Sequence, residues 1–318
     1  MKFAVIGVGW WGRNIIKTLL EFEEVSSIYI FDSFHDVYSK ITKHEKIKIV
    51  SKLEEIIFDP SIEAVCISTP PQSHYELSKK CLINNKHVIV EKPPAYEIEQ
   101  VIELKDIAFK NKLIYMLDAL YLFLDPIRKL KEFVDSGEIT NIKYIQLFRL
   151  GDELRRTGSG LKRIQETMFN NKTDIIEDVF FHDAGILLYL FGDLKFVSVE
   201  KLYIYNPSLC DSARIKLNAG NIPVDVNLSW TLTGRRRGIV VYSKDHIYEY
   251  DALVQEKQLS KFNISSMEYK YYDFNNIPPL KSMLFYFINC ILIGSPNYLD
   301  AAFMEKIMKL WREIKNEK

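Results

Sequence analysis

Short apolar segments alternate with helical patterns over residues 1–120, and this alternation restricts the fold more than any other feature. Strand patterns occur at residues 3–6, 27–31, 47–50, 64–68, 87–90 and 113–117. Helical patterns occur between them, at residues 14–21, 53–58, 73–84 and 98–110. Strands and helices that alternate in this way form a parallel sheet with helices on both faces. We therefore expect an α/β domain with a doubly wound parallel sheet, a Rossmann domain, over residues 1–120.

The pattern changes after residue 120. A helix is expected at residues 126–135, a long strand at 143–150 and, after a polar loop, a helix at 173–190. Further strand patterns occur at residues 196–205, 213–217, 224–230, 239–242 and 247–250, and helical patterns at 281–293 and 301–314. Consecutive strands with short turns favour antiparallel pairing. Residues 121–318 are therefore predicted to form an α+β domain with an open, mostly antiparallel sheet.

Composition and charge exclude several classes of protein. Hydrophobic residues make up 47% of the chain, and 42 Lys and Arg balance 42 Asp and Glu. A nucleic-acid-binding protein usually has a basic excess, which this chain lacks. No apolar run reaches the ~18 residues of a membrane-spanning helix. The N-terminus does not resemble a signal peptide, and the four cysteines form no CxxC pair. We expect a cytoplasmic protein with no membrane or nucleic-acid partner and no metal.

A glycine-rich turn follows the first strand and precedes a helix. It consists of Gly7, Val8, Gly9, Trp10, Trp11 and Gly12. In a dinucleotide-binding turn, the first glycine makes the tight bend, the second lets a pyrophosphate approach the backbone, and the third lets helix and strand pack closely. The helix N-terminus then offers free N–H groups to the phosphate. The turn therefore predicts a dinucleotide site.

Asp32 ends the second strand, 20 residues after Gly12, where a ribose-binding acid is expected. A carboxylate accepts hydrogen bonds from both ribose hydroxyls and repels a 2′-phosphate. Ser33 and Phe34 supply no arginine for such a phosphate. The sequence therefore favours NAD, with NADP as the alternative because Lys40 and Lys43 are near in sequence.

Two further segments follow strands of the first domain, at the sheet edge where doubly wound folds bind ligands. Thr69, Pro70 and His74 follow the fourth strand, and Glu91 and Lys92 follow the fifth. A lysine at this edge can polarise a carbonyl or lower the pKa of a hydroxyl. Taken alone, it could equally be a solvated surface lysine.

Together, the glycine turn, the Thr-Pro-x-x-x-His run at residues 69–74 and the Glu-Lys-Pro run at 91–93 resemble the Gfo/Idh/MocA oxidoreductases. Residues 178–183 (Asp-Val-Phe-Phe-His-Asp) are similar to the Asp-x-Gly-x-His segment of that family. Ser229-Trp230 together with residues 235–244, and the closing residues 279–311, resemble the branch associated with sugar-nucleotide and surface-glycan metabolism. The resemblance implies an NAD(P)-dependent enzyme of sugars, sugar nucleotides or polyols. It also implies a cleft between the domains as the site, and a homodimer or homotetramer.

The resemblance makes Lys92, Asp178 and His182 the catalytic candidates, and Asp178 and His182 are also candidates for substrate binding. Asp178 and His182 are four residues apart, hence on one face of a helix, and a histidine is the natural proton carrier at neutral pH. Asp183 could instead be the charge partner of His182. Phe180 stands where the family pattern has glycine, and we expect this bulky side chain to reshape the substrate pocket relative to that of relatives.

A basic cluster stands in the polar loop after residue 150. It comprises Arg155, Arg156, Lys162 and Arg163. Such a cluster could bind a diphosphate or carboxylate of a substrate, or it could belong to a solvated loop. The sequence thus predicts hydride exchange between a nicotinamide and a hydroxyl or keto carbon. Two alternatives remain: a reductase or dehydratase-like enzyme that acts on a keto-sugar, and a catalytically idle NAD-binding regulatory protein.

Overall fold

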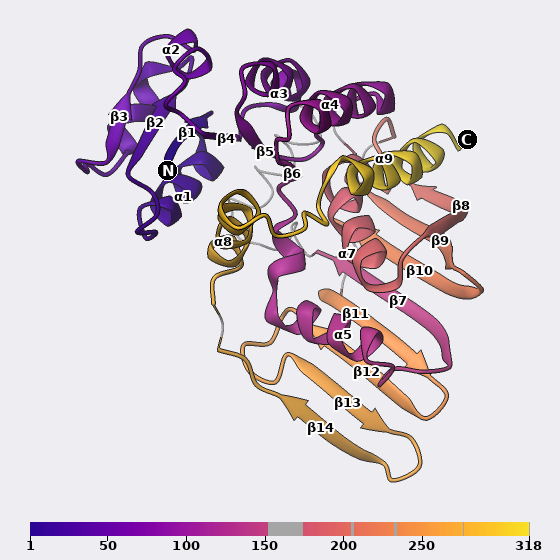
Figure 1. Cartoon of the computed structure of the whole chain (residues 1–318). Coiled ribbons are helices and arrows are strands. Elements are labelled where there is room, and N and C mark those ends of the chain that lie inside the picture. The colour runs from indigo at the N-terminus through magenta and orange to yellow at the C-terminus, as the bar shows by residue number, and fades with distance from the viewer. Residues whose placement is uncertain (152–173, 205–206, 232–233, 276, 318) are drawn as a thin grey trace. The chain divides into compact units, whose positions relative to one another are not determined.

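The computed structural model describes residues 1–151, 174–204, 207–231, 234–275 and 277–317 (Figure 1). The chain forms two compact units. The first comprises Met1–Phe123 and Ile277–Met308, and the second comprises Leu124–Asn276 and Lys309–Lys318. This division differs from the sequence-based one at 120/121 because residues 277–308 return to the N-terminal unit.

The first unit contains a six-stranded parallel sheet. Its strands are β1 (Lys2–Ile6), β2 (Ser27–Phe31), β3 (Ile47–Ile49), β4 (Ala64–Ile67), β5 (His87–Val90) and β6 (Tyr115–Leu117). The strand order is β3-β2-β1-β4-β5-β6, and all neighbours are parallel. The order reverses between β1 and β4, which is the point where doubly wound sheets bind dinucleotides. The predicted Rossmann sheet is confirmed.

Helices connect these strands. They are α1 (Trp10–Leu19), α2 (Glu54–Ile57), α3 (His74–Ile83) and α4 (Ile98–Lys110). The chain moves from β1 to β2 in one direction and from β4 to β5 in the other, so right-handed crossovers place α1 and α3 on opposite faces of the sheet. Helix α4 packs beside α3, and α8 (Pro279–Leu292) packs beside α1.

The returning segment completes the core of the first unit. The ring of Phe3 meets Phe287 edge-on at 6.3 Å, and Phe22 stacks on Phe285 at 6.5 Å. The main-chain N–H of Leu117 in β6 donates to the carbonyl of Leu299 at 3.0 Å. Residues 277–308 therefore cover apolar surface of the first unit and hydrogen-bond to its edge strand β6.

The second unit contains an eight-stranded sheet. Its strands are β7 (Ile142–Leu150), β8 (Leu194–Leu202), β9 (Ser212–Ala219), β10 (Ile222–Ser229), β11 (Arg236–Ser243), β12 (His246–Asp251), β13 (Leu259–Asn263) and β14 (Glu268–Tyr272). The order is β14-β13-β12-β11-β7-β10-β9-β8, and among the described strands of this second sheet only β7 and β10 pair in parallel. The expected mostly antiparallel sheet is confirmed.

Helical segments of this unit lie on the sheet (Figure 1). They are α5 (Asp125–Asp135), the π-helical turn η5 (Ile176–Phe180) and α7 (Phe181–Phe191). Helix α9 (Ala301–Asn316) begins among residues of the first unit and ends among those of the second. Strands β13 and β14 were not predicted from the sequence. For β14 the reason is that four of its five side chains are exposed, and an exposed edge strand carries no apolar alternation. No helix of the described residues is both long and apolar enough to cross a bilayer.

Candidate functional site

The glycine turn between β1 and α1 is fixed by close packing. Gly7 has a φ of +90°, and a Cβ at this position would lie 2.7 Å from main-chain atoms of Ser68 and Thr69. A Cβ at Gly12 would lie 2.0 Å from the carbonyl oxygen of Gly7. Only glycine satisfies both positions, so the turn after β1 is held directly against the segment that follows β4.

Gly9 differs from the other two glycines of the turn. A Cβ at Gly9 would have no protein atom within 4 Å, and its backbone is extended, with a φ of −61° and a ψ of −163°. Gly9 is the N-cap of α1, whose first turn contributes N–H groups that point out of the helix. The turn therefore keeps a hydrogen-bonding surface open beside Gly9, and this surface fits the pyrophosphate of a dinucleotide.

Asp32 is bound to this turn by its carboxylate. Its Oδ2 accepts a hydrogen bond from the N–H of Val8 at 2.6 Å, and its Oδ1 accepts one from the N–H of Phe34 at 2.9 Å. The hydroxyl of Tyr38 bonds to the main chain of Asp32. An ionised carboxylate has about four acceptor positions. Asp32 can therefore hold the turn and still accept hydrogen bonds from a ribose.

The two tryptophans of the turn have different environments. The indole Nε1 of Trp11 donates to Oδ2 of Asp118 at 2.7 Å, and burial raises the pKa of Asp118 to about 6. Trp10 is 71% exposed and stacks on Trp11 at 5.7 Å. Trp10 is thus the ring that a bound molecule can reach. Asp118 was not predicted as a site residue from the sequence. Its position directly after β6 could have indicated it, because ligands bind at the edge of the sheet where the parallel strands end.

His74 is fully buried at the start of α3. Its Nδ1 lies 2.8 Å from the carbonyl oxygen of Pro93, and its Nε2 lies 2.8 Å from that of Thr69. Burial lowers the pKa of His74, although hydrogen bonds to the main chain of Pro93, Thr69 and Glu91 act in the opposite direction. Both ring nitrogens are therefore engaged by the protein. The structure places His74 behind the ligand-binding edge rather than on it.

The other predicted residues of this edge lie at the surface of the first unit. Pro70 is exposed, and Thr69, Glu91 and Lys92 are partly exposed. The Oγ1 of Thr69 shares a hydrogen bond of 2.7 Å with the hydroxyl of Ser73. Because β4 and β5 are adjacent and parallel, the segments of Thr69 and Lys92 leave the same edge of the sheet.

Asp178 and His182 belong to the second unit. Asp178 lies in the π-helical turn, whereas His182 is the second residue of α7, and both side chains are half-buried. Four residues span slightly more than one turn of an α-helix. A π-helical turn contains more residues than an α-helical one, so it changes the rotation of the chain between positions 178 and 182. Turns of this kind are frequent at functional sites.

Asp183 has its own charge partner. Arg149 of β7 donates from Nε to both carboxylate oxygens of Asp183, at 3.0 and 2.9 Å, and a further hydrogen bond runs from its terminal nitrogen. The Asp183 side chain is only 1% exposed. Asp183 thus pairs with Arg149 of β7. The predicted substrate-binding residues Arg155, Arg156 and Arg163 lie outside the described residues, as does Lys162.

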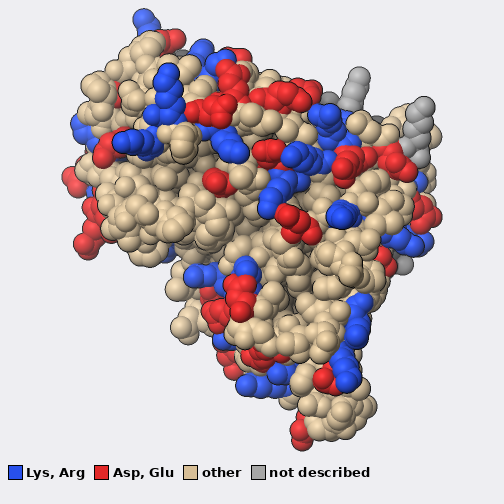
Figure 2. Space-filling view, turned by 45° about the vertical axis from the view of Figure 1, so that its right-hand side comes forward, with Lys and Arg blue, Asp and Glu red and all other residues tan. Residues whose placement is uncertain are grey.

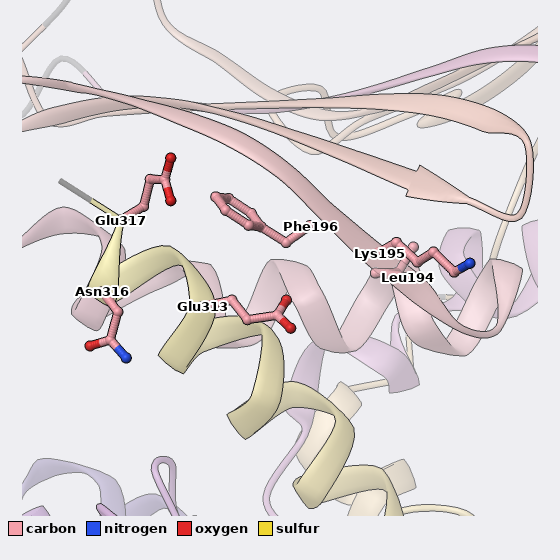
Figure 3. Close-up of a pocket in the computed structure, with 6 residues that line it drawn as sticks. All are labelled: Leu194, Lys195, Phe196, Glu313, Asn316 and Glu317. Carbon is pink, nitrogen blue, oxygen red and sulfur yellow. The ribbon is translucent and has the colours of Figure 1, made fainter.

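The rest of the described surface offers weaker candidates for a ligand-binding site. An open hollow with a volume of about 470 Å³ lies between β8 and the end of α9. It is lined by the residues labelled in Figure 3, which are Leu194, Lys195, Phe196, Glu313, Asn316 and Glu317. None of these residues belongs to a predicted motif. On the face seen in Figure 2, basic and acidic side chains are interspersed. No cluster of three or more metal-ligating side chains occurs among the described residues.

Comparisons with known proteins agree with this geometry. Residues 1–119 match the family model of the GFO_IDH_MocA oxidoreductases, described as an NAD-binding Rossmann fold. An uncharacterized oxidoreductase of Synechocystis is 28% identical over 46% of this chain and 40% of its own length. The scyllo-inositol 2-dehydrogenase (NADP(+)) IolW of Bacillus subtilis is 25% identical over 63% of this chain and 54% of its own length. The chain thus spans only about half of these curated relatives.

A solved structure extends the likeness of the fold to nearly the whole chain. The UDP-N-acetylglucosamine 3-dehydrogenase GnnA of Acidithiobacillus ferrooxidans superposes with a TM-score of 0.80. The superposition covers 99% of this chain and 96% of that protein, at 17% sequence identity. The family model, the glycine turn and the two sheets lead to one assignment, which confirms the resemblance seen in the sequence. Residues 1–119 therefore match the Gfo/Idh/MocA oxidoreductase family with its NAD-binding Rossmann fold, and the rest of the chain is similar in fold to GnnA.

Proposed function

We propose that this protein is an NAD-dependent oxidoreductase that acts on a CH–OH group of a sugar, sugar nucleotide or polyol. The cofactor assignment rests on the open space beside Gly9. Gly7 and Gly12 are required by the packing of the protein itself, whereas no protein atom occupies the space beside Gly9. A glycine there serves a molecule that approaches the backbone.

Asp32 supports the choice of NAD over NADP. Hydrogen bonds from the N–H groups of Val8 and Phe34 hold its carboxylate beside the glycine turn. A 2′-phosphate would bring negative charge against it. The relative IolW is named for NADP(+), so membership of the family leaves the preference open, and the residues at this position decide it.

Three side chains are proposed to assist the reaction. When bound, the nicotinamide supplies the hydride acceptor or donor. His182 takes the hydroxyl proton of the substrate during oxidation and returns it during reduction. Lys92 stabilises negative charge on the reacting oxygen. Asp178 orients His182, because Asp183 is committed to Arg149.

The substrate class is proposed from the relatives. GnnA is named as a dehydrogenase of a nucleotide sugar, and IolW as one of an inositol. Both names describe the oxidation of a ring carbon that bears a hydroxyl. The basic residues Arg155, Arg156 and Arg163 would suit the diphosphate of a nucleotide sugar, which makes this the first substrate class to assay.

The glycine turn offers a sharp test of cofactor binding. Gly9→Ala adds a methyl group that meets no protein atom, so the melting temperature should stay within about 2 °C while the affinity for NADH falls at least about tenfold. Gly12→Ala is the matched control and should lower the melting temperature, because its methyl would clash with Gly7. Titration with NADH and NADPH measures both affinities. Normal NADH binding by Gly9→Ala, or tighter binding of NADPH by the wild type, would contradict the assignment.

Turnover tests the enzymatic part of the proposal. The wild-type protein is assayed with NAD against a panel of nucleotide sugars and polyols, and in reverse with NADH and keto-sugars. Lys92→Ala and His182→Ala should each lower kcat by about 10²–10⁴ with little change in NAD affinity. NADH binding without turnover on either panel would instead favour the idle regulatory protein. Near wild-type kcat for His182→Ala would make His182 a structural residue.

A further inference from the structure

A hydrogen bond joins Trp11 to Asp118 at the edge of the parallel sheet where doubly wound folds bind ligands. Trp11 is in the first turn of α1, which follows β1, whereas Asp118 comes directly after β6. The indole Nε1 of Trp11 donates to Oδ2 of Asp118 at 2.7 Å. In the strand order β1-β4-β5-β6, two strands separate the two that precede these residues. The bond therefore bridges the interval in which β4 and β5 end.

The order of the strands indicates which half of a dinucleotide lies near this bond. The proposed function places the pyrophosphate at Gly9, after β1, and a ribose at Asp32, after β2. Strand β2 is on one side of β1, whereas β4, β5 and β6 are on the other. Because the adenosine half is directed toward Asp32, the nicotinamide half extends toward the ends of β4, β5 and β6. Trp11 and Asp118 meet on this side, and Lys92 comes shortly after β5 on the same side.

Trp11 and Asp118 differ in their access to a ligand. Asp118 is only 4% exposed, and the main chain of Leu120 also hydrogen-bonds to its carboxylate. Trp11 is partly exposed, and the ring of Trp10, which is 71% exposed, stacks on it at 5.7 Å. The carboxylate is thus fixed inside the protein, and the two indoles present an aromatic surface to the solvent. Aromatic surfaces of this kind pack against other rings.

We infer that Asp118 is a positioning residue, which holds the stacked indoles of Trp11 and Trp10 where they contact the nicotinamide half of the bound dinucleotide. The inference rests on the proposed function, because it takes NAD(H) as the bound molecule. It deepens that proposal by assigning these three residues to one half of the cofactor. Asp118 acts through the indole of Trp11, since its own carboxylate is buried.

Two ligands separate the halves of the cofactor in a binding experiment. ADP contains the adenosine and the two phosphates of NADH but lacks the nicotinamide and its ribose. Asp118→Leu removes the acceptor of the indole N–H and keeps a side chain of the same branched shape. The affinity for NADH should fall about fivefold, which corresponds to one net hydrogen bond, while the affinity for ADP stays within about twofold. Isothermal titration calorimetry of the full chain measures both affinities.

Trp11→Phe removes the donor of the same bond, and it should also lower the affinity for NADH about fivefold. Because one bond links the two residues, the double variant should again lose about fivefold, whereas two independent effects would multiply to about 25-fold. Met116→Val is the matched control, since Met116 is fully buried in β6, two positions before Asp118. This control should lower the melting temperature and leave the ratio of the two affinities unchanged.

The ratio of the affinities for NADH and ADP decides the outcome. If Asp118→Leu weakens ADP binding as much as NADH binding, or if Met116→Val changes the ratio equally, Asp118 only supports the fold and the inference fails. Unchanged NADH affinity in both single variants, or multiplied losses in the double variant, would also overturn it. A wild-type protein that binds neither NADH nor ADP would contradict the proposed function itself, and with it the inference.

Discussion

His182 and Asp183 are neighbours in the sequence, but the structure gives them different partners and exposures. Asp183 is buried and bound by the guanidinium of Arg149, whereas His182 is half-buried. His74 shows the same contrast with its motif, since its ring lies inside the fold. The presence of a residue in a sequence motif therefore does not show whether its side chain is exposed to a ligand or buried within the fold.

His87 makes the stability of the fold sensitive to pH. Its Nδ1 accepts a hydrogen bond of 2.9 Å from the N–H of Ile114, and burial lowers the pKa of the ring. The unfolded chain therefore binds protons more readily than the folded one below about pH 7, so the free energy of unfolding falls as the pH falls. We expect a measurable loss between pH 7.5 and 6.0 in urea titrations.

The variant His87→Asn isolates this effect. The Asn oxygen can accept the same N–H but does not titrate, so the variant should lose part of the pH dependence. His74 contributes in the same direction because burial lowers its pKa too. The raised pKa of Asp118, at about 6, acts in the opposite direction at lower pH. An unchanged pH slope in His87→Asn would exclude His87 as a source.

At the scale of elements, the glycine turn and the π turn show two ways in which a short segment fixes a site. The turn is shaped by contacts that leave no room for a Cβ at Gly7 and Gly12. The π turn changes the rotation of the chain between Asp178 and His182. The first device was visible in the sequence as glycine spacing, whereas the second had no sequence signal that we recognised.

The ion pair between β7 and α7 should be the dominant polar contribution to the docking of that helix. Arg149→Ala leaves the Asp183 carboxylate buried without this partner, and should destabilise the protein by about 3–5 kcal/mol. Arg214→Ala is the matched control on the same sheet. Its ion pair with Glu200 is exposed, and should contribute only about 0.2–1 kcal/mol.

Chemical unfolding of both variants measures the difference. The double variant Arg149→Met with Asp183→Leu should be more stable than Arg149→Ala, because no charge is then left buried. Equal losses in Arg149→Ala and Arg214→Ala would show that the pair contributes no more than a surface contact.

At the scale of the whole molecule, the first unit is built from two stretches of chain that lie far apart in sequence. A fragment of residues 1–123 lacks Phe287, which packs on Phe3, and Leu299, which pairs with β6. Each large apolar side chain that loses its burial costs about 1.5–3 kcal/mol, and domains are stable by only about 5–15 kcal/mol. We expect this fragment to be largely unfolded.

Joining residues 277–308 to that fragment through a flexible linker should restore a cooperative thermal transition, as followed by circular dichroism. The same linker joined to residues 277–308 in scrambled order is the control. A cooperative transition in the 1–123 fragment alone would show that the returning segment is dispensable.

The sequence by itself determined the features that depend on local spacing. These include the alternation that forms the parallel sheet, the glycine turn after β1, and the placement of Asp32, Thr69 and Lys92 after their strands. Such features are readable because each depends on residues a few positions apart, whose types are restricted by backbone geometry and burial.

Only the tertiary structure decided the features that depend on residues far apart in the chain. The contacts Trp11–Asp118, His74–Pro93 and Arg149–Asp183 join segments 107, 19 and 34 positions apart, and residues 277–308 return to a unit that begins at Met1. No local pattern encodes such pairings, because each side chain would be equally acceptable with another partner. They are fixed only when the packed sheet and its helices bring distant atoms within bonding distance.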